Sequence, residues 1–312
     1  MMENSPPGLP DVSVVVATHR RPDLLRRTLL SILGQGYPGH IECLVVFDQE
    51  DPVAPDVDVP QGREIRLVRN TRTPGPAGAY NEGLLLARGA YVALCNDDDE
   101  WLRDKLQLQV AALEAAPDAL YAICGIYLGD RRAWARNPAR IPDKEVIGLR
   151  DLLRLSRNEV HTSTLLFRRD WLLRDVGLVD ESIPGSYGED YDWLLRAARI
   201  APGVAVRQAL ARVRWQHSYF ADRWPVMIQA LTYQLEHRPE LKQDPVNLAR
   251  VYGRLAFAQA ASGNRGEARE WARRSIRLHW LQPRAYLAYL VSYGLVKPQT
   301  ILRLAHTVGR GV

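Results

Sequence analysis

Three consecutive aspartates, Asp97, Asp98 and Asp99, follow directly on an apolar run at residues 91–95. The run has the length and the strand-forming side chains of one buried β-strand. Carboxylate oxygens suit hard divalent ions such as Mg²⁺ or Mn²⁺. Because ligands of open α/β sheets bind beyond the carboxyl ends of the strands, we predict a cation site here. Acidic residues ahead of a helix also act as caps, so this second interpretation stays open.

These aspartates need a sheet to position them, and the N-terminal part of the chain has the pattern of one. Runs rich in Val, Ile and Leu alternate with segments in which apolar residues recur every three to four positions. This alternation is typical of a mainly parallel α/β sheet covered by helices. The predicted strands are 12–17, 42–47, 64–68, 91–95 and 120–128, the predicted helices are 22–33, 79–88 and 102–113, and residues 161–171 are predicted as a strand that enters a helix.

Two common nucleotide-binding motifs are absent from this α/β pattern. The sequence contains no G-x-x-x-x-G-K-[ST] phosphate loop. Gly75, Gly78 and Gly83 lack dinucleotide spacing, and they do not join the first strand to its helix. A nucleotide would therefore be held in another way.

The length and composition are those of a globular protein of about two average domains. The chain has 312 residues, of which 46% are hydrophobic and 25% charged. Its net charge of +5 is unevenly distributed, because residues 201–312 carry 17 Lys/Arg against 6 Asp/Glu, whereas residues 1–200 carry 24 against 30. The basic part would suit phosphate, an anionic membrane face or an acidic partner, or it is a solvated helical surface.

Cysteine usage and hydropathy predict a cytoplasmic protein. Cys43, Cys95 and Cys124 are odd in number and have no short spacing, which favours free thiols in a reducing compartment over disulfides or a zinc site. The N-terminus lacks the pattern of a signal peptide, and no apolar run approaches the roughly 18 residues of a membrane span. A peripheral position at the inner face of the cell membrane stays open.

Four segments in order resemble the inverting glycosyltransferases of family 2, which have the GT-A fold. They are the opening strand and turn at 12–22, Asp48, the stretch 70–83 and the DXD-like motif at 96–101. The resemblance covers about residues 11–220. It implies a mixed α/β sheet, a divalent cation (Mg²⁺ or Mn²⁺), and transfer of a sugar from a nucleotide-diphosphate sugar to an acceptor hydroxyl. Bacterial surface-glycan or secondary-glycoside biosynthesis is the implied setting.

The resemblance also implies a role for each site residue. Inverting sugar transfer needs a base beside the acceptor hydroxyl, and we assign it to Asp190, with Glu189 as the weaker choice. The same two acids could cap a helix. The implied metal ligands are Asp98, Asp97, Asp99 and His217; the nucleotide-binding residues are Ala17, Thr18, His19, Arg20, Asp48, Asn70, Gly78, Asn81, Asn96 and Asp97; and the acceptor region comprises His161, Thr162, Ser163 and Trp101.

Two residues depart from the family pattern. Asn96 stands where the metal motif most often begins with Asp, and Tyr80 stands where an Arg commonly precedes the family's Asn, here Asn81. The first change predicts an ion held through Asp98 and water. The second removes one expected contact to the diphosphate.

From about residue 222 the sequence becomes helical. Residues 246–261 and 268–278, joined by Gly263–Glu267, resemble one tetratricopeptide-type hairpin, which is too little for a free-standing solenoid. The aromatic segment 280–296 could lie on a membrane surface or in a core. We expect a flexible arm at 1–10, a GT-A domain at 11–220 and a helical domain at 221–312 that serves as a platform or as a stabilising appendage.

Two other functions are compatible with the residues. A nucleotidyltransferase that makes the activated sugar would more often have a Gly-rich basic loop after the first strand, where this chain has residues 18–21. A catalytically weak, transferase-like binding module is suggested by Asn96 and Tyr80. The expected partners are the nucleotide-sugar donor and a glycan, lipid-linked or small-molecule acceptor. No nucleic acid is expected, and a homo-oligomer stays open.

Overall fold

The computed structural model describes residues 8–129, 134, 136–154, 160–214 and 223–307, and the side chains of these residues up to Leu304. His217, one of the expected metal ligands, lies outside these ranges. Among the described residues, no helix combines the length and the apolar character that crossing a membrane requires.

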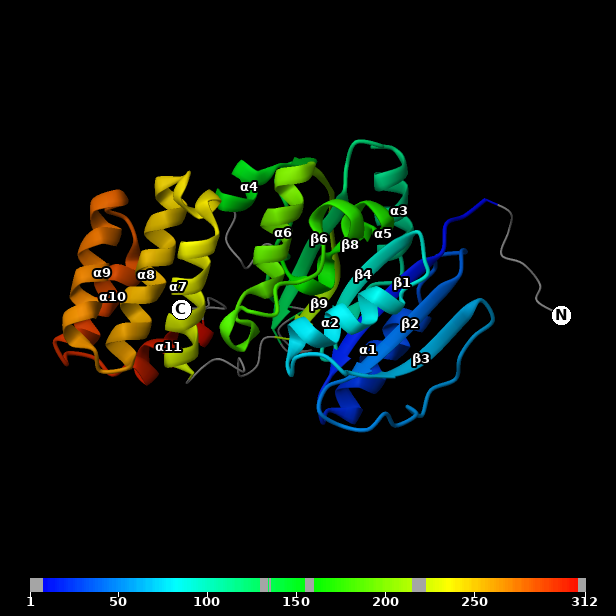
Figure 1. The fold of residues 1–312 in the computed structure, drawn as a ribbon, viewed down its shortest axis with the longest axis horizontal. Helices are drawn as coiled ribbons and strands as arrows, with labels where there is room; N and C mark the ends of the chain where they lie inside the picture. Colours follow the sequence, from blue (N-terminus) through cyan, green and yellow to red (C-terminus); the bar gives the residue numbers. More distant parts are fainter. Residues whose placement is uncertain (1–7, 130–133, 135, 155–159, 215–222, 308–312) are drawn as a thin grey trace. The chain divides into compact units, whose positions relative to one another are not determined.

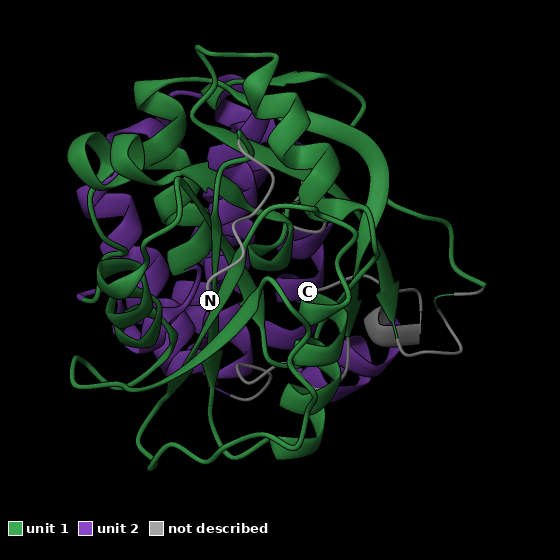
Figure 2. Cartoon of the chain, turned by 90° about the vertical axis from the view of Figure 1, so that its right-hand side faces the viewer, with its two compact units in different colours: residues 1–149, 159–181, 189–214 green, residues 150–158, 182–188, 215–312 purple. Residues whose placement is uncertain are grey.

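The chain divides into two compact units, coloured separately in Figure 2. The first comprises residues 1–149, 159–181 and 189–214, and the second comprises residues 150–158, 182–188 and 215–312. The first unit contains the sheet and the second contains the C-terminal helices (Figure 1). The predicted α/β sheet followed by C-terminal helices is confirmed.

Nine strands form one mixed sheet in the described part of the first unit. The spatial order is β3-β2-β1-β4-β8-β6-β9-β5, with β7 paired to β9. Strands β1 to β4 are mutually parallel where they pair, whereas β8 runs antiparallel to both β4 and β6. The strands are β1 (Val12–Thr18), β2 (Ile41–Phe47), β3 (Arg63–Arg69), β4 (Tyr91–Asn96), β5 (Glu100–Trp101), β6 (Tyr121–Gly129), β7 (Val146–Ile147), β8 (Leu166–Arg168) and β9 (Gly203–Arg214).

The register of the parallel strands brings their carboxyl ends to one edge. Thr18 at the end of β1 lies opposite Phe47 of β2, and Ala17 lies opposite Asn96 of β4. Strands β1 and β2 are almost completely buried, as expected for parallel strands covered on both faces. The residues that follow these strands therefore meet in one region.

The helices of the first unit pack on this sheet (Figure 1). In α2, Gly83 lies so close to β1 that a Cβ atom would be 2.3 Å from Cγ1 of Val15. Helix α1 begins with Pro22 and buries Leu25, Leu29 and Ile32. The helices are α1 (Pro22–Leu33), α2 (Pro76–Leu86), α3 (Lys105–Glu114), α5 (Arg169–Trp171) and α6 (Glu189–Ile200), and α4 (Leu149–Arg154) crosses the boundary between the units.

Three predicted elements differ from the observed ones. Helix α2 begins at Pro76 rather than at 79, because proline suits the first turn of a helix. The predicted helix over 102–113 begins only at Lys105, after the short strand β5. Residues Thr162–Thr164 form a 3₁₀ turn ahead of strand β8. Strand β9 was not predicted.

The second unit is a helical array with an alanine-rich core. Ala256, Ala258, Ala268 and Ala272 are fully buried, and these small side chains let α8 and α9 pack closely. The helices are α7 (Trp224–His237), α8 (Pro245–Ala261), α9 (Arg265–Leu278), α10 (Pro283–Ser292) and α11 (Pro298–Thr307). The domain bounds expected from the sequence remain a prediction.

Candidate active site

Asp48, directly after β2, organises the edge of the sheet beside β1. Its carboxylate accepts hydrogen bonds from Nδ2 of Asn70 at 2.7 Å and from the amide of Gly75 at 3.0 Å. Its carbonyl oxygen lies 2.7 Å from Nδ1 of His19. Three separate loops are thus held together around one acid. The predicted nucleotide-binding residues Asp48, Asn70 and His19 therefore form one cluster.

The three aspartates after β4 have three different environments. Asp97 accepts a hydrogen bond from Oγ1 of Thr18 at 2.9 Å and pairs with Arg21 at 3.2 Å. Asp99 is 1% exposed, and its two oxygens accept hydrogen bonds from the Ser163 hydroxyl and, at 2.9 Å, from the Arg214 amide. Asp98 retains 24% side-chain exposure and lies 3.4 Å from Arg21. Asp98 is therefore the carboxylate with the most capacity for another ligand.

The three neighbouring carboxylates disfavour one another's negative charge. Burial, followed by the neighbouring carboxylates of Asp99 and Asp97, raises the pKa of Asp98 to about 7, against a smaller lowering by Arg21 and His161. Burial likewise raises the pKa of Asp99 to about 7, although Ser163 and the Arg214 amide lower it. Burial also raises the pKa of Asp97 despite the Arg21 guanidinium. Such a cluster suits a divalent cation, which would favour the charged carboxylates.

The protein side chains here suit an ion that takes most of its coordinating atoms from water and substrate rather than from the protein. Within the described residues, no three His, Cys, Asp or Glu side chains are placed to hold a metal ion together. Mg²⁺ commonly binds through one or two carboxylates, with water and substrate phosphates completing the shell. Asp98, the most exposed of the three aspartates, is the candidate for such a carboxylate. The interpretation of the three aspartates as helix caps is wrong, because β5 follows them and α3 begins only at Lys105.

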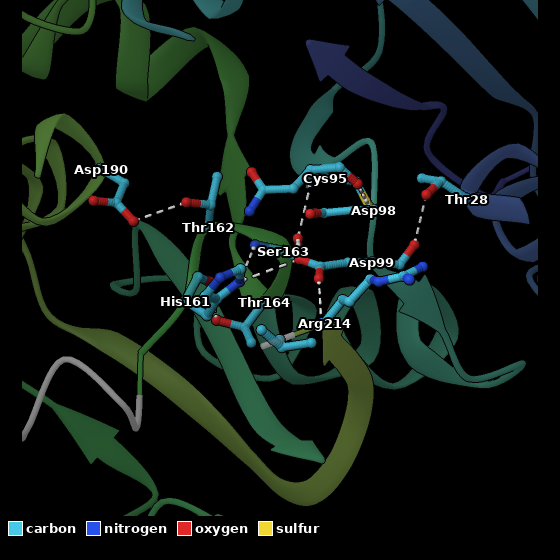
Figure 3. Close-up of polar contacts among 12 residues, drawn as sticks. Thr28, Cys95, Asp98, Asp99, His161, Thr162, Ser163, Thr164, Asp190 and Arg214 are labelled. Atoms are coloured by element: carbon cyan, nitrogen blue, oxygen red, sulfur yellow. Dashed lines mark hydrogen bonds and ion pairs between the residues drawn. The ribbon is translucent and has the colours of Figure 1, made fainter. Parts of the chain in front are cut away.

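A three-residue segment, His161–Ser163, links the aspartate cluster to the second acidic motif (Figure 3). The Ser163 hydroxyl donates to Asp99, and His161 Nδ1 lies 3.4 Å from the same carboxylate. Thr162 Oγ1 donates to Asp190 Oδ2 at 2.8 Å. One turn of 3₁₀ helix therefore contacts acids that stand 91 positions apart, at 99 and 190.

His161 lies within electrostatic range of both acidic motifs. Burial lowers its pKa, and the carboxylates of Asp190 and Asp98 oppose that shift. The ring therefore favours the neutral form. Trp101, 4% exposed, supports this region by donating from Nε1 to the Ser163 carbonyl at 2.8 Å. The four residues expected at the acceptor region thus lie together.

Glu189 and Asp190 open helix α6, where acids also favour the helix dipole. Glu189 is 8% exposed, whereas Asp190 is only half-buried and contacts Thr162. Burial of Tyr80 is the main cause of its strongly raised pKa, and the negative charges of Glu189 and Asp190 raise it further. The second acidic motif therefore also faces Tyr80.

The two departures from the family pattern contact each other. The Tyr80 hydroxyl donates to Oδ1 of Asn96 at 2.7 Å, and Tyr80 is 3% exposed. This chain thus has a neutral, hydrogen-bonded pair at these two places. The sequence positions, sixteen apart, did not indicate this contact.

Several other predicted nucleotide-binding residues have structural partners. The buried amide of Asn81 exchanges hydrogen bonds with the backbone of Val179 at 2.8 and 2.9 Å and donates to Glu181 at 2.7 Å. A Cβ atom on Gly78 would lie 2.0 Å from the Thr73 carbonyl oxygen, so only glycine fits there. Ala17 lies in β1 beside Asn96, and Arg20 adopts a φ of 54°.

Sequence reasoning did not single out Arg21 or Glu181. Arg21 pairs with Asp97 and Asp98, and it stands next to the predicted Arg20. Glu181 pairs with Arg72 at 2.6 Å and contacts Asn81. The only sequence signal for an acidic partner such as Glu181 was an asparagine, Asn81, in a glycine-rich segment.

Comparison with known proteins identifies the family. The model described as "Glycosyl transferase family 2" matches residues 13–174, over half of the chain. The chain belongs to this family.

Two curated relatives illustrate where similar sequences occur. The succinoglycan biosynthesis protein ExoO of Rhizobium meliloti is 33% identical over 117 residues, which cover 36% of this chain and 33% of that protein. The UDP-Glc:alpha-D-GlcNAc-diphosphoundecaprenol beta-1,3-glucosyltransferase WfaP of Escherichia coli is 30% identical over 104 residues, covering 33% of this chain and 41% of that protein. The matched segment thus spans between a third and about two fifths of these relatives.

Solved structures share the fold at low identity. The mannosyltransferase PcManGT of Pyrobaculum calidifontis, solved with GDP-Man and Mn²⁺, has a TM-score of 0.55 and 19% identity, covering 96% of this chain and 85% of that one. Residues 1–349 of S. aureus TarS, solved with UDP-GlcNAc, have a TM-score of 0.55 and 16% identity, covering 91% of each chain. The chain thus belongs to glycosyltransferase family 2 and has the GT-A fold.

Proposed function

We propose that this chain is a metal-dependent, inverting glycosyltransferase that moves a sugar from a nucleotide-diphosphate sugar to an acceptor hydroxyl. One observation carries the proposal. The segment His161–Ser163 contacts Asp99 of the aspartate cluster through Ser163 and contacts Asp190 through Thr162. The aspartate cluster, which contains the proposed cation ligand Asp98, and the candidate base Asp190 are therefore joined by the same short turn. That is the arrangement that sugar transfer with a diphosphate leaving group requires.

Asp190 is the proposed base. It would accept the proton of the acceptor hydroxyl while the acceptor oxygen forms a bond to the anomeric carbon. The anomeric carbon–oxygen bond to the diphosphate breaks, the diphosphate departs with the bonding electrons, and the configuration inverts. The greater exposure of Asp190 and its contact with Thr162 favour it over Glu189. Thr162 orients the carboxylate that receives the proton.

Asp98 is the proposed direct ligand of Mg²⁺ or Mn²⁺, with Asp97 and Asp99 beside it. A bound ion would supply charge neutralisation to the departing diphosphate. Asp97 and Asp99 are engaged by Thr18, Arg21, Ser163 and the Arg214 amide, so they position Asp98 and add negative potential. The likeness to a mannosyltransferase solved with Mn²⁺ supports this assignment.

The nucleotide would lie over the carboxyl ends of β1, β2 and β4. Asp48, held by Asn70 and the Gly75 amide, presents a fixed carboxylate there, beside His19. Arg21 offers a guanidinium next to Asp98, where a diphosphate would need positive charge. We therefore add Arg21 to the proposed donor-binding residues.

The proposed setting is bacterial surface-glycan biosynthesis in the cytoplasm. The names of several relatives refer to polysaccharides, such as succinoglycan, teichuronic acid and amylovoran. All three cysteines of the chain are free and buried, which suits a reducing compartment. The relatives' names support a glycan or lipid-linked acceptor for this chain.

Calorimetric titration with UDP, GDP, dTDP and CDP, with and without Mn²⁺, tests the proposal. We expect one nucleotide to bind in a Mn²⁺-dependent manner, and Asp98→Ala to abolish that dependence. Asp118→Ala, an exposed aspartate before β6, is the matched control and should bind like the wild type. Absence of binding for all four nucleotides, with and without metal, would refute the catalytic assignment.

A further inference from the structure

Helix α10 of the second unit exposes some of its large apolar residues to solvent. Its fully buried residues are small or medium, Ala285, Ala288, Val291 and Ser292, while Leu287 and Tyr289 pack, partly buried, against the core. Tyr286, Leu290 and Tyr293 follow one another at i, i+4 and i+7, so they share the opposite face, and they are 45%, 38% and 61% exposed. Water-facing helix surfaces are normally polar, so this exposed apolar face marks an interaction surface.

The segments on either side of α10 extend this apolar face. The Tyr286 hydroxyl donates to the Trp280 carbonyl at 2.7 Å, which holds the 280–281 loop beside the helix. After α10, Gly294 (φ 76°) and Leu295 donate to the carbonyls of Val291 and Leu290, which is a Schellman motif. We define the aromatic patch by its exposed members: Trp280 (69%), Leu281 (58%), Tyr286, Leu290, Tyr293 and Leu295 (70%).

The part of the chain that carries the aromatic patch is strongly basic. Residues 269–312 contain eight Lys/Arg and one acid, Glu270, which pairs with Arg273 and Arg274. The Arg269 guanidinium lies 5.2 Å from the Tyr293 ring centroid, and Arg277 and Lys297, both exposed, flank the patch along the chain. A second copy of this face would bring like charges together. Charge complementarity therefore favours an anionic occupant.

We infer that the aromatic patch and its basic surround bind the surface of an anionic lipid bilayer. Tryptophan and tyrosine suit the boundary between headgroups and acyl chains, because their rings are apolar and carry one polar group. Lysine and arginine beside them are attracted by anionic headgroups. Since no described helix can cross a membrane, the contact is with the membrane surface. This inference does not depend on the sugar-transfer proposal.

Flotation of the full chain with lipid vesicles tests the inference. We expect binding to equal mixtures of phosphatidylcholine and phosphatidylglycerol, weak binding to phosphatidylcholine alone, and release at high salt. The double variant Trp280→Ala/Tyr293→Ala should lower binding by about tenfold or more, because both side chains are exposed and their loss leaves the core intact. The double variant Arg277→Gln/Lys297→Gln should lower binding to the anionic vesicles selectively.

A matched control distinguishes vesicle binding through the aromatic patch from nonspecific binding by exposed apolar residues. Ile200→Ala removes a 48% exposed apolar residue of the first unit and should bind vesicles like the wild type. Equal binding to neutral and anionic vesicles would overturn the inference, as would an equal loss of binding in the Ile200 variant. Absence of vesicle binding together with dimerisation that Trp280→Ala/Tyr293→Ala abolishes would assign the patch to a second copy of the chain instead.

Discussion

Asp97, Asp98 and Asp99 are neighbours in the chain, but each contributes differently to the site. Thr18 and Arg21 hold Asp97, while Ser163 and the Arg214 amide occupy the oxygens of Asp99. Asp98 retains the most accessible carboxylate of the three. A run of identical residues thus separates into two supporting groups and one group able to take a ligand.

The neutral pair of Tyr80 and Asn96 gives a prediction at this scale. Tyr80→Phe removes the 2.7 Å hydrogen bond and leaves the Asn96 oxygen without that donor, so we expect a loss of about 1–2 kcal/mol in unfolding free energy. Chemical denaturation measures this loss. In an Asn96→Ala background, the same Tyr80→Phe change should cost clearly less, because the partner is already absent. Equal costs in both backgrounds would show that the pair is not coupled.

Glu42, at the opposite end of strands β1 and β2, gives a prediction about pH. Burial raises its pKa, but hydrogen bonds from Ser13, the Arg88 amide and Arg66 outweigh burial, so the pKa lies below its ordinary value of 4.5. A carboxyl with a lowered pKa in the folded state adds stability above pH 4.5. That stability is lost as the pH falls through the lower folded-state pKa.

The change that tests this pH dependence is Glu42→Gln. We expect it to lower the unfolding free energy at pH 7 by about 1.5–3 kcal/mol and to reduce the acid sensitivity of the protein. Denaturant unfolding between neutral and acidic pH measures both effects. Glu236→Gln, at an exposed position of α7, serves as the control and should follow the wild-type curve. A Glu42 variant with unaltered acid sensitivity would contradict the assignment.

At the scale of elements, the turn at His161–Ser163 joins the two acidic motifs. It lies between β4, which precedes the aspartates, and α6, which begins with Glu189 and Asp190. Trp101 fixes the turn through the Ser163 carbonyl, and Gln109 of α3 donates to the Thr164 carbonyl at 2.7 Å. The turn is therefore held by neighbouring elements on two sides.

Thr162→Val tests the role of this turn. It keeps the shape of the side chain but removes the hydrogen bond to Asp190, so the proposed base loses its orientation. We expect kcat to fall by about tenfold or more while KM for the donor stays near the wild-type value. Steady-state kinetics separate these effects, and Thr300→Val, an exposed threonine in α11, is the control. A rise in KM at unchanged kcat would instead place Thr162 in donor binding.

The local pattern of the chain made much of the sheet predictable. Apolar runs at 12–17 and 91–95 correspond to β1 and β4 because parallel, doubly covered strands are continuously hydrophobic. Strand β9 was not predicted because its alternation is interrupted at Arg207 and Gln208, which are both exposed, where its pairing with β6 shifts register. Sequence periodicity indicates an element most clearly where a whole face is buried.

The contacts that complete the candidate site depend on distant parts of the chain. Ser163 meets Asp99 across 64 positions and Asn81 meets Val179 across 98 positions. No local signal in a single sequence specifies such pairs. The acidic motifs were recognisable from their order along the chain, whereas the supporting roles of Ser163, Asn81 and Glu181 needed the fold.

At the scale of the whole molecule, the N-terminal and C-terminal parts of the sequence have opposite charge balances. Residues 201–312, which include β9 of the first unit as well as the C-terminal helices, hold an excess of 11 basic side chains, 17 against 6, whereas residues 1–200 have an excess of 6 acidic ones, 30 against 24. The acidic part contains the proposed chemistry, and the basic part contains the aromatic patch. The central claim concerns the first part, where cation binding and proton acceptance are assigned to different carboxylates.

The most direct test compares Asp190→Asn with Asp98→Ala in one pair of measurements, nucleotide binding by calorimetry and turnover of the matching nucleotide sugar. We predict that Asp190→Asn binds the nucleoside diphosphate with Mn²⁺ as the wild type does but loses about 10²–10⁴-fold in kcat. Asp98→Ala should lose both, and Asp118→Ala neither. If Asp190→Asn turned over the donor at the wild-type rate, or lost nucleotide binding together with Asp98→Ala, the separation of roles proposed for the two acidic motifs would be contradicted.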